Sequence, residues 1–272
     1  MNYLYSERIS CKMKYQFILL FIGCLLCRCE SPSVNNLDKN VVRAGMATGD
    51  EKAITLAKRI EEASGGKENW EKVHFISFDY FGSRYWYWDK FKNRYRVESE
   101  KRKYRIAGSL DGKETHLWLR GNIVTDPDTL SKYKDLGYKA WINDTYWLIL
   151  PFKLLDPGVQ LQYVGDCVFD STHHAICMDM TFQNVGVTPE NKYRVYVDTV
   201  SNDIIYWDHY QNKNDSLPTL SNPWTDYRPY GKIRLAGGRG DERGLESIVL
   251  YDHLSDQIFT DVSKPYSEIL KK

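Results

Sequence analysis

The sequence predicts an α+β domain built around a long antiparallel sheet. Aromatic residues make up 14% of the chain, and its 20 Tyr and 8 Trp residues favour pleated, half-buried surfaces. Short apolar segments separated by turn residues follow one another at a spacing of about ten residues, which is typical of hairpins. Helical patterns are confined to one segment before these strands and one between them, so the helical crossovers of a parallel sheet are missing.

Length and charge restrict the class of protein. The 272 residues, of which 42% are hydrophobic, suffice for one large domain with a substantial core. Lys and Arg number 37 against 36 Asp and Glu, so the net charge of +1 lacks the basic excess of a nucleic-acid-binding protein. Ordinary hydrophobic content and a low net charge also argue against a disordered chain.

The first 29 residues have the pattern of an export signal. Lys12 and Lys14 precede an apolar run over 17–27, which is too short to span a bilayer but typical of a secretory signal, with Met13 as a candidate start. Four of the six cysteines lie in this segment. We therefore assign residues 1–29 to an upstream extension and a lipoprotein-type signal, and expect them to take no part in the fold.

A cysteine at the end of such a leader resembles a bacterial lipoprotein signal, in which it becomes the lipidated first residue of the mature chain. Cys24 follows a small residue, Gly23, but few apolar residues precede it. Cys29 stands at a suitable distance from Met13, although Arg28 occupies the position of the expected small residue. Both remain candidates for lipidation, with Cys29 slightly favoured. The alternative is a simple membrane anchor or a cleaved signal that carries no lipid. Acyl chains would anchor an exported protein in the cell envelope, at the outer membrane or the periplasmic face, and leave its body in water.

Residues 30–49 are polar and show no apolar period, which predicts a flexible tether. A single domain is then expected over 50–272. It opens with an amphipathic helix over 50–64, with Asp50 as the N-cap and two glycines after its last turn. The apolar face of this helix comprises Ala53, Ile54, Leu56, Ala57 and Ile60.

Two runs of strands follow, with a helical segment between them. The first run is predicted over 73–82, 84–90, 94–98, 103–107 and 115–119. Apolar residues at mixed three- and four-residue steps over 128–155 predict two short helices. The second run is predicted over 159–169, 175–184, 193–198, 204–210, 231–235 and 247–251, with a polar loop at 211–221.

Signatures of enzymes are missing from the sequence. It contains no phosphate-binding glycine loop, no nucleophile elbow and no zinc-binding helix, and the glycine-rich segment 237–240 fits a hairpin turn. Arg239 begins the cell-adhesion tripeptide Arg-Gly-Asp, for which chance is an equal explanation. His173 and His174 are adjacent, so their side chains diverge and do not favour a shared metal. We predict no catalytic residue, no metal and no cofactor, and a hydrolase of unrecognised type is the remaining enzyme alternative.

Cys167 and Cys177 are the only cysteines outside the leader. A hairpin turning about Thr172 would place them directly across from each other, where Cβ atoms lie roughly 4.5–5.5 Å apart, so a disulfide is a candidate. An oxidising export compartment would permit the bond. Two free buried thiols acting as small hydrophobic residues are the alternative, and either role is structural.

Several segments carry a resemblance to a known family. They are the segment 138–159, which reads YKAWINDTYWLILPFKLLDPGV, and the later segments 185–189, 193–198 and 224–231. Together they resemble an uncharacterised family of exported lipoproteins of Gram-negative bacteria. That family is in turn similar to the outer-membrane lipoprotein-sorting superfamily, a lipoprotein carrier and its receptor. The resemblance extends over about residues 50 to 262 of the chain.

This resemblance implies an incomplete antiparallel β-barrel of about 10–11 strands, with helices covering its open side and an apolar cavity that takes acyl chains. The segment 138–155 would then be a helical lid. The residues expected to line the cavity are Phe75, Phe78, Tyr80, Trp86, Trp88, Trp118, Trp141, Tyr146, Trp147, Leu150 and Phe152. Aromatic residues at such positions are also common in a packed core, so plain packing remains an alternative.

The sequence thus favours a lipid-anchored envelope protein without catalytic activity that binds an apolar or acylated ligand, a lipid or an acylated protein. The alternative is a surface-tethered interaction scaffold with a packed, ligand-free barrel, whose contact residues would include Tyr227, Arg228 and Tyr230. Nucleic acid is not expected as a partner, and the sequence leaves the oligomeric state open.

Overall fold

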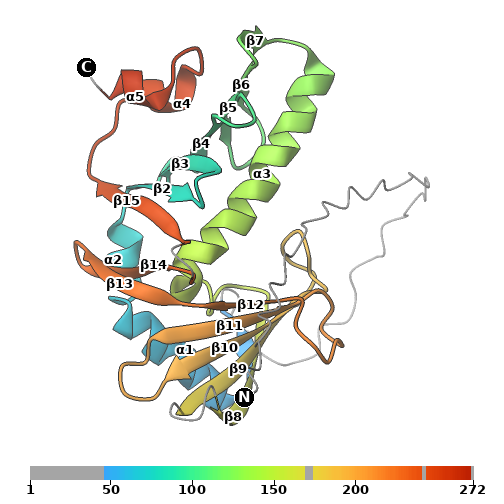
Figure 1. Cartoon of the computed structure of the whole chain (residues 1–272), viewed down its shortest axis with the longest axis vertical. Helices are drawn as coiled ribbons and strands as arrows, with labels where there is room; N and C mark the ends of the chain where they lie inside the picture. Colours follow the sequence, from blue (N-terminus) through green and yellow to red (C-terminus); the bar gives the residue numbers. More distant parts are fainter. Residues whose placement is uncertain (1–45, 169–173, 241–242, 271–272) are drawn as a thin grey trace, which may run out of the picture. The chain divides into compact units, whose positions relative to one another are not determined.

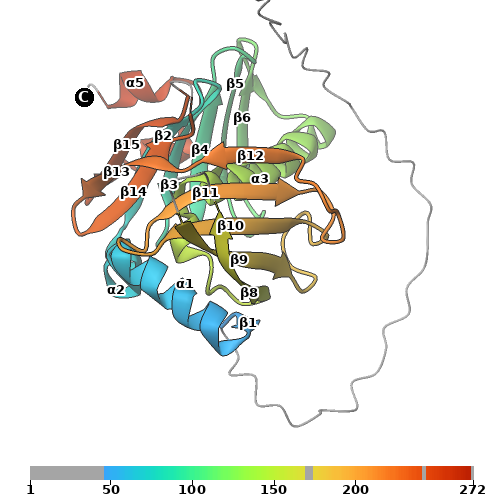
Figure 2. The same ribbon diagram turned by 60° about the horizontal axis from the view of Figure 1, so that its bottom comes forward.

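The computed structural model describes residues 46–168, 174–240 and 243–270 (Figures 1 and 2). The predicted leader with Cys24 and Cys29, and most of the predicted tether, lie outside the described residues. None of the helices in the described part of the chain combines the length and the apolar composition that a membrane-spanning helix requires.

The first predicted helix is confirmed. Helix α1 spans Glu51–Ala63, and the side chain of Asp50 accepts a hydrogen bond from the backbone nitrogen of Ala53 at 2.9 Å, as an N-cap does. A short second helix, α2 (Lys67–Lys72), was not predicted. The glycine turn between them is required by packing, because a Cβ at Gly65 would lie 2.4 Å from the carbonyl oxygen of Lys232.

The first run of strands forms a seven-stranded antiparallel sheet with the order β15-β2-β3-β4-β5-β6-β7. Consecutive strands pair through hairpins, as their spacing predicts, and the last strand of the chain pairs with β2. The bounds are β2 (Phe75–Tyr80), β3 (Arg84–Asp89), β4 (Arg94–Ser99), β5 (Tyr104–Ser109), β6 (Thr115–Leu119), β7 (Asn122–Val124) and β15 (Leu245–Tyr251).

The first four strands of the second run, β8 to β11, form a separate six-stranded sheet together with β1 and β12 (Figure 2). Its order is β1-β8-β9-β10-β11-β12, and its β1–β8 pair is parallel whereas its other pairs are antiparallel. Two further strands, β13 and β14, pair only with each other. The bounds are β1 (Thr48–Gly49), β8 (Val159–Val168), β9 (His174–Phe182), β10 (Lys192–Asp198), β11 (Ile204–Tyr210), β12 (Leu220–Pro223), β13 (Thr225–Tyr230) and β14 (Ile233–Gly238).

The prediction of one continuous sheet is therefore wrong, because the described strands divide into three sheets. The fold class is confirmed: the protein is α+β, with mostly antiparallel sheets that stay open rather than closing into a barrel. The strands beyond the predicted 10–11 are β1, β7, β12 and β13. Two of these are only two or three residues long and two contain proline, so neither alternation nor propensity marks them.

The helical segment between the two runs is one helix and not two. Helix α3 spans Pro127–Ile149 without interruption, and a 3₁₀ turn, η1 (Leu150–Phe152), follows it directly (Figure 1). Its apolar residues fall at mixed steps because the helix contacts two cores. Leu148 belongs to the core on the seven-stranded sheet, whereas Tyr146 packs against the core of the six-stranded sheet.

Three clusters of buried side chains hold these layers together. Helix α3 covers one face of the seven-stranded sheet, and α1 packs on the six-stranded sheet. The other face of the seven-stranded sheet is covered by two short helices that were not predicted, α4 (Gln257–Thr260) and α5 (Tyr266–Ile269).

Candidate functional site

Most of the residues predicted to line a cavity lie in packed cores. Phe78, Trp86, Trp88, Leu150 and Phe152 are at most 8% exposed and belong to the buried clusters around α3 and η1. The region between α3 and the seven-stranded sheet is therefore largely filled by side chains, which is the packing alternative that the sequence left open.

Two more of the predicted lining residues pack in the same layer. The indole of Trp141 meets that of Trp88 edge to face, with ring centroids 5.1 Å apart. The ring of Tyr80 lies under the guanidinium of Arg84 at 4.8 Å, and its hydroxyl accepts a hydrogen bond from Asn143 at 3.1 Å. Both side chains thus contribute to the contact between helix and sheet.

Phe75 and Trp118 lie on the other face of the seven-stranded sheet. Phe75 packs in the cluster under α4, with its ring centroid 6.0 Å from that of Phe259. Trp118 lies 3.8 Å from the guanidinium of Arg105, which donates to the carbonyl oxygen of Val262 near the C-terminus. The structure does not bring these two side chains together with the others.

The remaining two, Tyr146 and Trp147, line a pocket of about 260 Å³. It lies at one end of the six-stranded sheet, between the C-terminal half of α3 and the strands β9 to β12, and the loop after β9 forms part of its wall. Its lining consists of Ile142, Asn143, Tyr146, Trp147, Phe182, Val185, Gly186, Val187, Thr188, Asn191, Tyr193, Trp207, His209 and Leu220.

Aromatic rings form a continuous wall of this pocket. Trp207 stacks on Tyr193 with centroids 4.9 Å apart and an interplanar angle of 10°, and the indole of Trp147 meets Trp207 edge to face at 4.7 Å. Phe182 and His209 contact Tyr193 at 5.9 and 5.1 Å. Such contacts fix the rings, so the wall is preorganised.

A buried arginine binds the backbone of Trp147. Arg239 is 1% exposed, its guanidinium lies 3.5 Å from the Trp224 ring, and it donates a hydrogen bond to the carbonyl oxygen of Trp147. This carbonyl belongs to the last turn of α3, where a cation is favourable. Burial lowers the pKa of Arg239 to about 9. Of the predicted hairpin turn over 237–240, Gly237 and Gly238 are the end of β14, and Gly238 bridges Gly244. Arg239 of the adhesion tripeptide is buried, and Asp241 lies outside the described residues.

The described residues that line the pocket include no Asp, Glu, Lys or Arg. Burial lowers the pKa of His209, so its imidazole is neutral at pH 7, and burial raises the pKa of Tyr193 and keeps its hydroxyl protonated. The polar lining groups are amides, hydroxyls and this imidazole, and the amide nitrogen of Asn191 donates to Thr188 Oγ1 at 2.9 Å. The pocket is therefore apolar and uncharged, with a few neutral polar groups.

A second hollow, of about 640 Å³, lies between α1, α2 and η1. Phe152 contributes to its floor, stacked on Trp70 with centroids 4.9 Å apart. Its lining carries both lysines and carboxylates, among them Lys58, Glu61 and Lys90. This mixture of opposite charges selects no single ligand chemistry.

The described part of the chain offers no candidate metal site. No group of three or more His, Cys, Asp or Glu side chains there is placed to hold a metal ion. His173 lies outside the described residues, and His174 is exposed at the start of β9.

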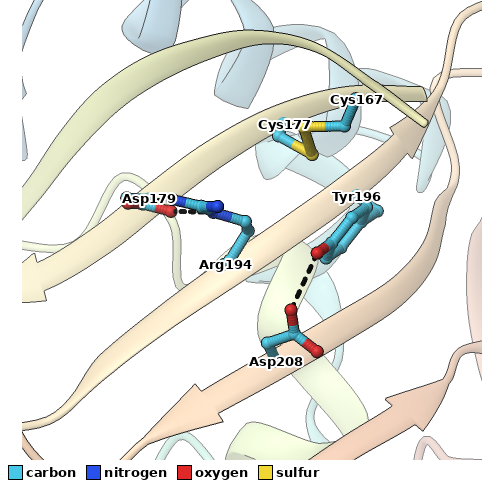
Figure 3. The surroundings of a disulfide bond; sticks show 6 residues. All are labelled: Cys167, Cys177, Asp179, Arg194, Tyr196 and Asp208. Atoms are coloured by element: carbon cyan, nitrogen blue, oxygen red, sulfur yellow. Dashed lines mark hydrogen bonds and ion pairs between the residues drawn. A yellow bond between two sulfur atoms is a disulfide. The ribbon is translucent and has the colours of Figure 1, made fainter. Parts of the chain in front are cut away.

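Cys167 and Cys177 form a disulfide between β8 and β9, with Cα atoms 5.8 Å apart (Figure 3). The two residues are diagonal neighbours and not directly opposite, because Cys177 pairs with Gly165 and Cys167 with Ala175. Cys167 pairs with Ala175 instead of Cys177, so the register differs by two positions from that of the expected hairpin about Thr172, a residue that lies outside the described part of the chain.

The neighbouring strands carry polar pairs beside this bond. Arg194 on β10 donates two hydrogen bonds to Asp179 on β9, at 2.7 and 2.9 Å (Figure 3). The hydroxyl of Tyr196 donates to Asp208 at 2.8 Å. These partners satisfy one another, so they stabilise the sheet and offer no reactive group.

Sequence reasoning missed most of the pocket. Phe182, Tyr193, Trp207 and His209 had been interpreted only as strand residues, and no pattern showed that one end of their sheet meets α3. One signal was available: the segment 185–189, which belongs to the resemblance, supplies four of the lining residues.

No protein-family model matches the sequence, and a search of curated proteins found no match. Among solved structures, a DUF1329 family protein from Desulfovibrio piger is 12% identical with a TM-score of 0.40, and covers 80% of this chain and 98% of its own. An outer membrane lipoprotein-sorting protein domain from Vibrio parahaemolyticus is 8% identical with a TM-score of 0.39, over 79% and 99% of the two chains. MucB is 13% identical with a TM-score of 0.26, over 77% and 62%. The description of the second of these structures agrees with the resemblance to lipoprotein-sorting proteins that the sequence carries.

Proposed function

We propose that this protein is a non-catalytic protein of the cell envelope that binds a small apolar ligand in the pocket between α3 and strands β9 to β12. The observation that carries the proposal is the lining itself: rigid aromatic rings and aliphatic side chains, with no charged residue among the described lining residues. An apolar cavity with a few neutral polar groups is the usual form of a small-molecule binding site.

The size of the pocket limits the ligand. Sites for drug-sized ligands measure roughly 300–1,000 Å³, and this pocket, at about 260 Å³, lies just below that range. It suits one short chain or one small ring system, and it is too small for the several acyl chains of a lipidated protein. The ligand we propose is therefore smaller than the resemblance to lipoprotein-sorting proteins implies.

The envelope location rests on the export signal and its cysteines. We propose that lipidation at Cys29 or Cys24 anchors the chain and that the predicted tether over 30–49 links this anchor to the domain over 50–272, which contains the pocket. The last two residues of the predicted tether, Thr48 and Gly49, pair with the domain as strand β1. Mass spectrometry of the mature protein tests the anchor, because acylation adds a defined mass to the first residue. A mature chain that begins at another residue without acyl groups contradicts it.

The interaction scaffold is less well supported. The hydroxyl of Tyr227 is bonded to the backbone nitrogen and oxygen of Ile204, both at 3.1 Å, and Tyr230 packs against the core of the seven-stranded sheet. Of its three expected contact residues, Arg228 is the exposed one, and it is paired with Asp226 at 2.9 Å. A binding anchor needs an accessible side chain, and two of these three are only partly exposed.

A binding experiment on the purified chain tests the proposal. We expect the fluorescent apolar probe N-phenyl-1-naphthylamine to bind the wild type, and Val187→Asp, at the pocket wall, to weaken binding at least tenfold, because a carboxylate there disfavours apolar contact. The matched control is Val200→Asp, at a residue 89% exposed outside the pocket lining. Probe that fails to bind, or equal losses in both variants, would contradict the proposal.

A further inference from the structure

We infer that the natural ligand of the pocket is a flat, uncharged ring system carrying a hydroxyl group, and not an aliphatic chain or a charged amphiphile. This inference rests on the proposed function and narrows its ligand class. It follows from three properties of the lining, which are its rings, its lack of charge and the way its polar groups are already used.

The rings favour a flat ligand. Six of the lining residues have cyclic side chains, and they come from both the helix and the sheet. They are Tyr146, Trp147, Phe182, Tyr193, Trp207 and His209. Aromatic rings contact other rings in offset-stacked and edge-to-face arrangements, which stabilise beyond the area that they bury. The wall already contains both arrangements, and a flat ring would extend them. An alkyl chain would be stabilised only by the apolar area that it buries.

The lack of charge excludes ions. The described lining residues include no Asp, Glu, Lys or Arg. Burial lowers the pKa of His209, so its imidazole is neutral at pH 7. A carboxylate or ammonium group within the pocket would lose its water without gaining an opposite charge. The aromatic lining alone does attract a cation, so a cationic ring is the informative competitor.

The polar lining groups favour a ligand group that both donates and accepts hydrogen bonds. The amide nitrogen of Asn143 donates to Tyr80 Oη at 3.1 Å and to Asp144 Oδ1 at 2.9 Å, and the amide nitrogen of Asn191 donates to Thr188 Oγ1 at 2.9 Å. Since three amide hydrogens are engaged, these side chains present mainly acceptor oxygens to a ligand. The lining residue Trp207, in contrast, has a buried indole nitrogen without a hydrogen-bond partner among the described residues. A hydroxyl can donate to the acceptors and accept from such an indole, whereas a carbonyl group can only accept.

Calorimetric titration of the purified chain with four probes tests the inference at pH 7.5. The probes are 2-naphthol, 2-naphthoate, 2-naphthyltrimethylammonium and 1-decanol, which vary charge and shape separately. We expect 2-naphthol to bind at least tenfold more tightly than each of the other three. Phe182→Leu keeps the site apolar but removes a ring, so it should weaken 2-naphthol three- to tenfold and leave 1-decanol unchanged. Phe91→Leu, at a ring 58% exposed outside this pocket, is the matched control and should change neither.

The outcomes separate this inference from the proposed function. If 1-decanol binds as tightly as 2-naphthol, apolar binding stands and the preference for a ring is wrong. If 2-naphthoate or the cationic probe binds as tightly as 2-naphthol, the requirement for an uncharged ligand is wrong. If none of the four probes binds, the proposed function itself fails together with the inference.

Discussion

The carboxylate of Asp144, on α3, accepts two hydrogen bonds from the guanidinium of Arg84, on β3, at 2.6 and 2.8 Å. Asp144 is fully buried, and it also accepts a hydrogen bond from the indole nitrogen of Trp86 at 2.8 Å. This ion pair joins the helix to the seven-stranded sheet across 60 positions of the chain. It therefore fixes the helix whose C-terminal half forms one side of the pocket.

Removing one partner of this ion pair should destabilise the protein. Asp144→Asn leaves the Arg84 guanidinium buried without its counter-charge, and we expect a loss of about 3–5 kcal/mol in the free energy of unfolding. Urea denaturation measures the loss. Asp135→Asn, at an exposed position of the same helix, is the matched control and should change stability by less than about 0.5 kcal/mol. Similar losses in both variants would show that Asp144 contributes no more than a surface carboxylate.

The middle of α3 approaches the sheet too closely for a side chain. A Cβ at Gly137 would lie 2.3 Å from the hydroxyl oxygen of Tyr95, so glycine is required despite its low helix propensity. We expect Gly137→Ala to destabilise the protein by about 1–3 kcal/mol, although alanine alone favours a helix. Adding Tyr95→Phe removes the closest atom and should restore part of the loss in thermal denaturation. Destabilisations that simply add would argue against this contact.

The sequence predicted the parts of the fold that local signals determine, and it missed those that depend on contacts between distant segments. The first helix follows from its cap at Asp50 and its apolar spacing, and the hairpins of the seven-stranded sheet follow from turn residues, because these signals are local. The single α3 and the division of the sheets depend on packing between distant segments. The pocket likewise requires Trp147 to meet Trp207, 60 residues later, which no local pattern encodes. Trp147 was predicted as a lining residue from the resemblance, but Trp207 was visible only as one aromatic residue in a strand.

The disulfide on the six-stranded sheet should stabilise the hairpin of β8 and β9 (Figure 3). Cys167 and Cys177 are separated by ten positions, and closing a loop of that size stabilises by about 3 kcal/mol in the chain-entropy view. We expect the Cys167→Ala/Cys177→Ala double variant to lose that amount in urea denaturation. Adding reductant should lower the stability of the wild type to the same level and leave the double variant unchanged. A reductant effect on the double variant would point to another cause.

Arg96 holds the C-terminal segment through backbone carbonyls. It is fully buried on β4 and donates to the carbonyl oxygens of Ile258 and Asp261 at 2.9 and 2.7 Å, and to that of Lys264. Arg96→Met leaves these carbonyl oxygens without their donor and the buried Glu98 carboxylate without its ion-pair partner, so we expect α4 and α5 to detach.

Limited chymotrypsin digestion with mass analysis measures this release. Cleavage after Phe259, which lies in α4 and is 4% exposed, should become at least tenfold faster in Arg96→Met than in the wild type, because the segment loses its contacts. The control is Arg194→Met, which breaks an ion pair on the other sheet and should leave this bond protected. Equal protection of the bond after Phe259 in the Arg96 variant and the wild type would show that Arg96 does not hold the segment.

Ligand binding should weaken in acid because of His209. Burial lowers the pKa of this imidazole below its ordinary value of 6.5, and a ligand that covers it further disfavours the charged form. A group with a lowered pKa resists protonation in the folded, liganded state, so protons favour the free and unfolded states. The affinity for 2-naphthol should therefore be constant above about pH 7.5 and fall as the pH decreases below 6.5. His209→Gln should bind independently of pH in this range, whereas His253→Gln, at an exposed residue, should retain the wild-type profile. A wild-type profile that matches the profile of His209→Gln would remove His209 from the site.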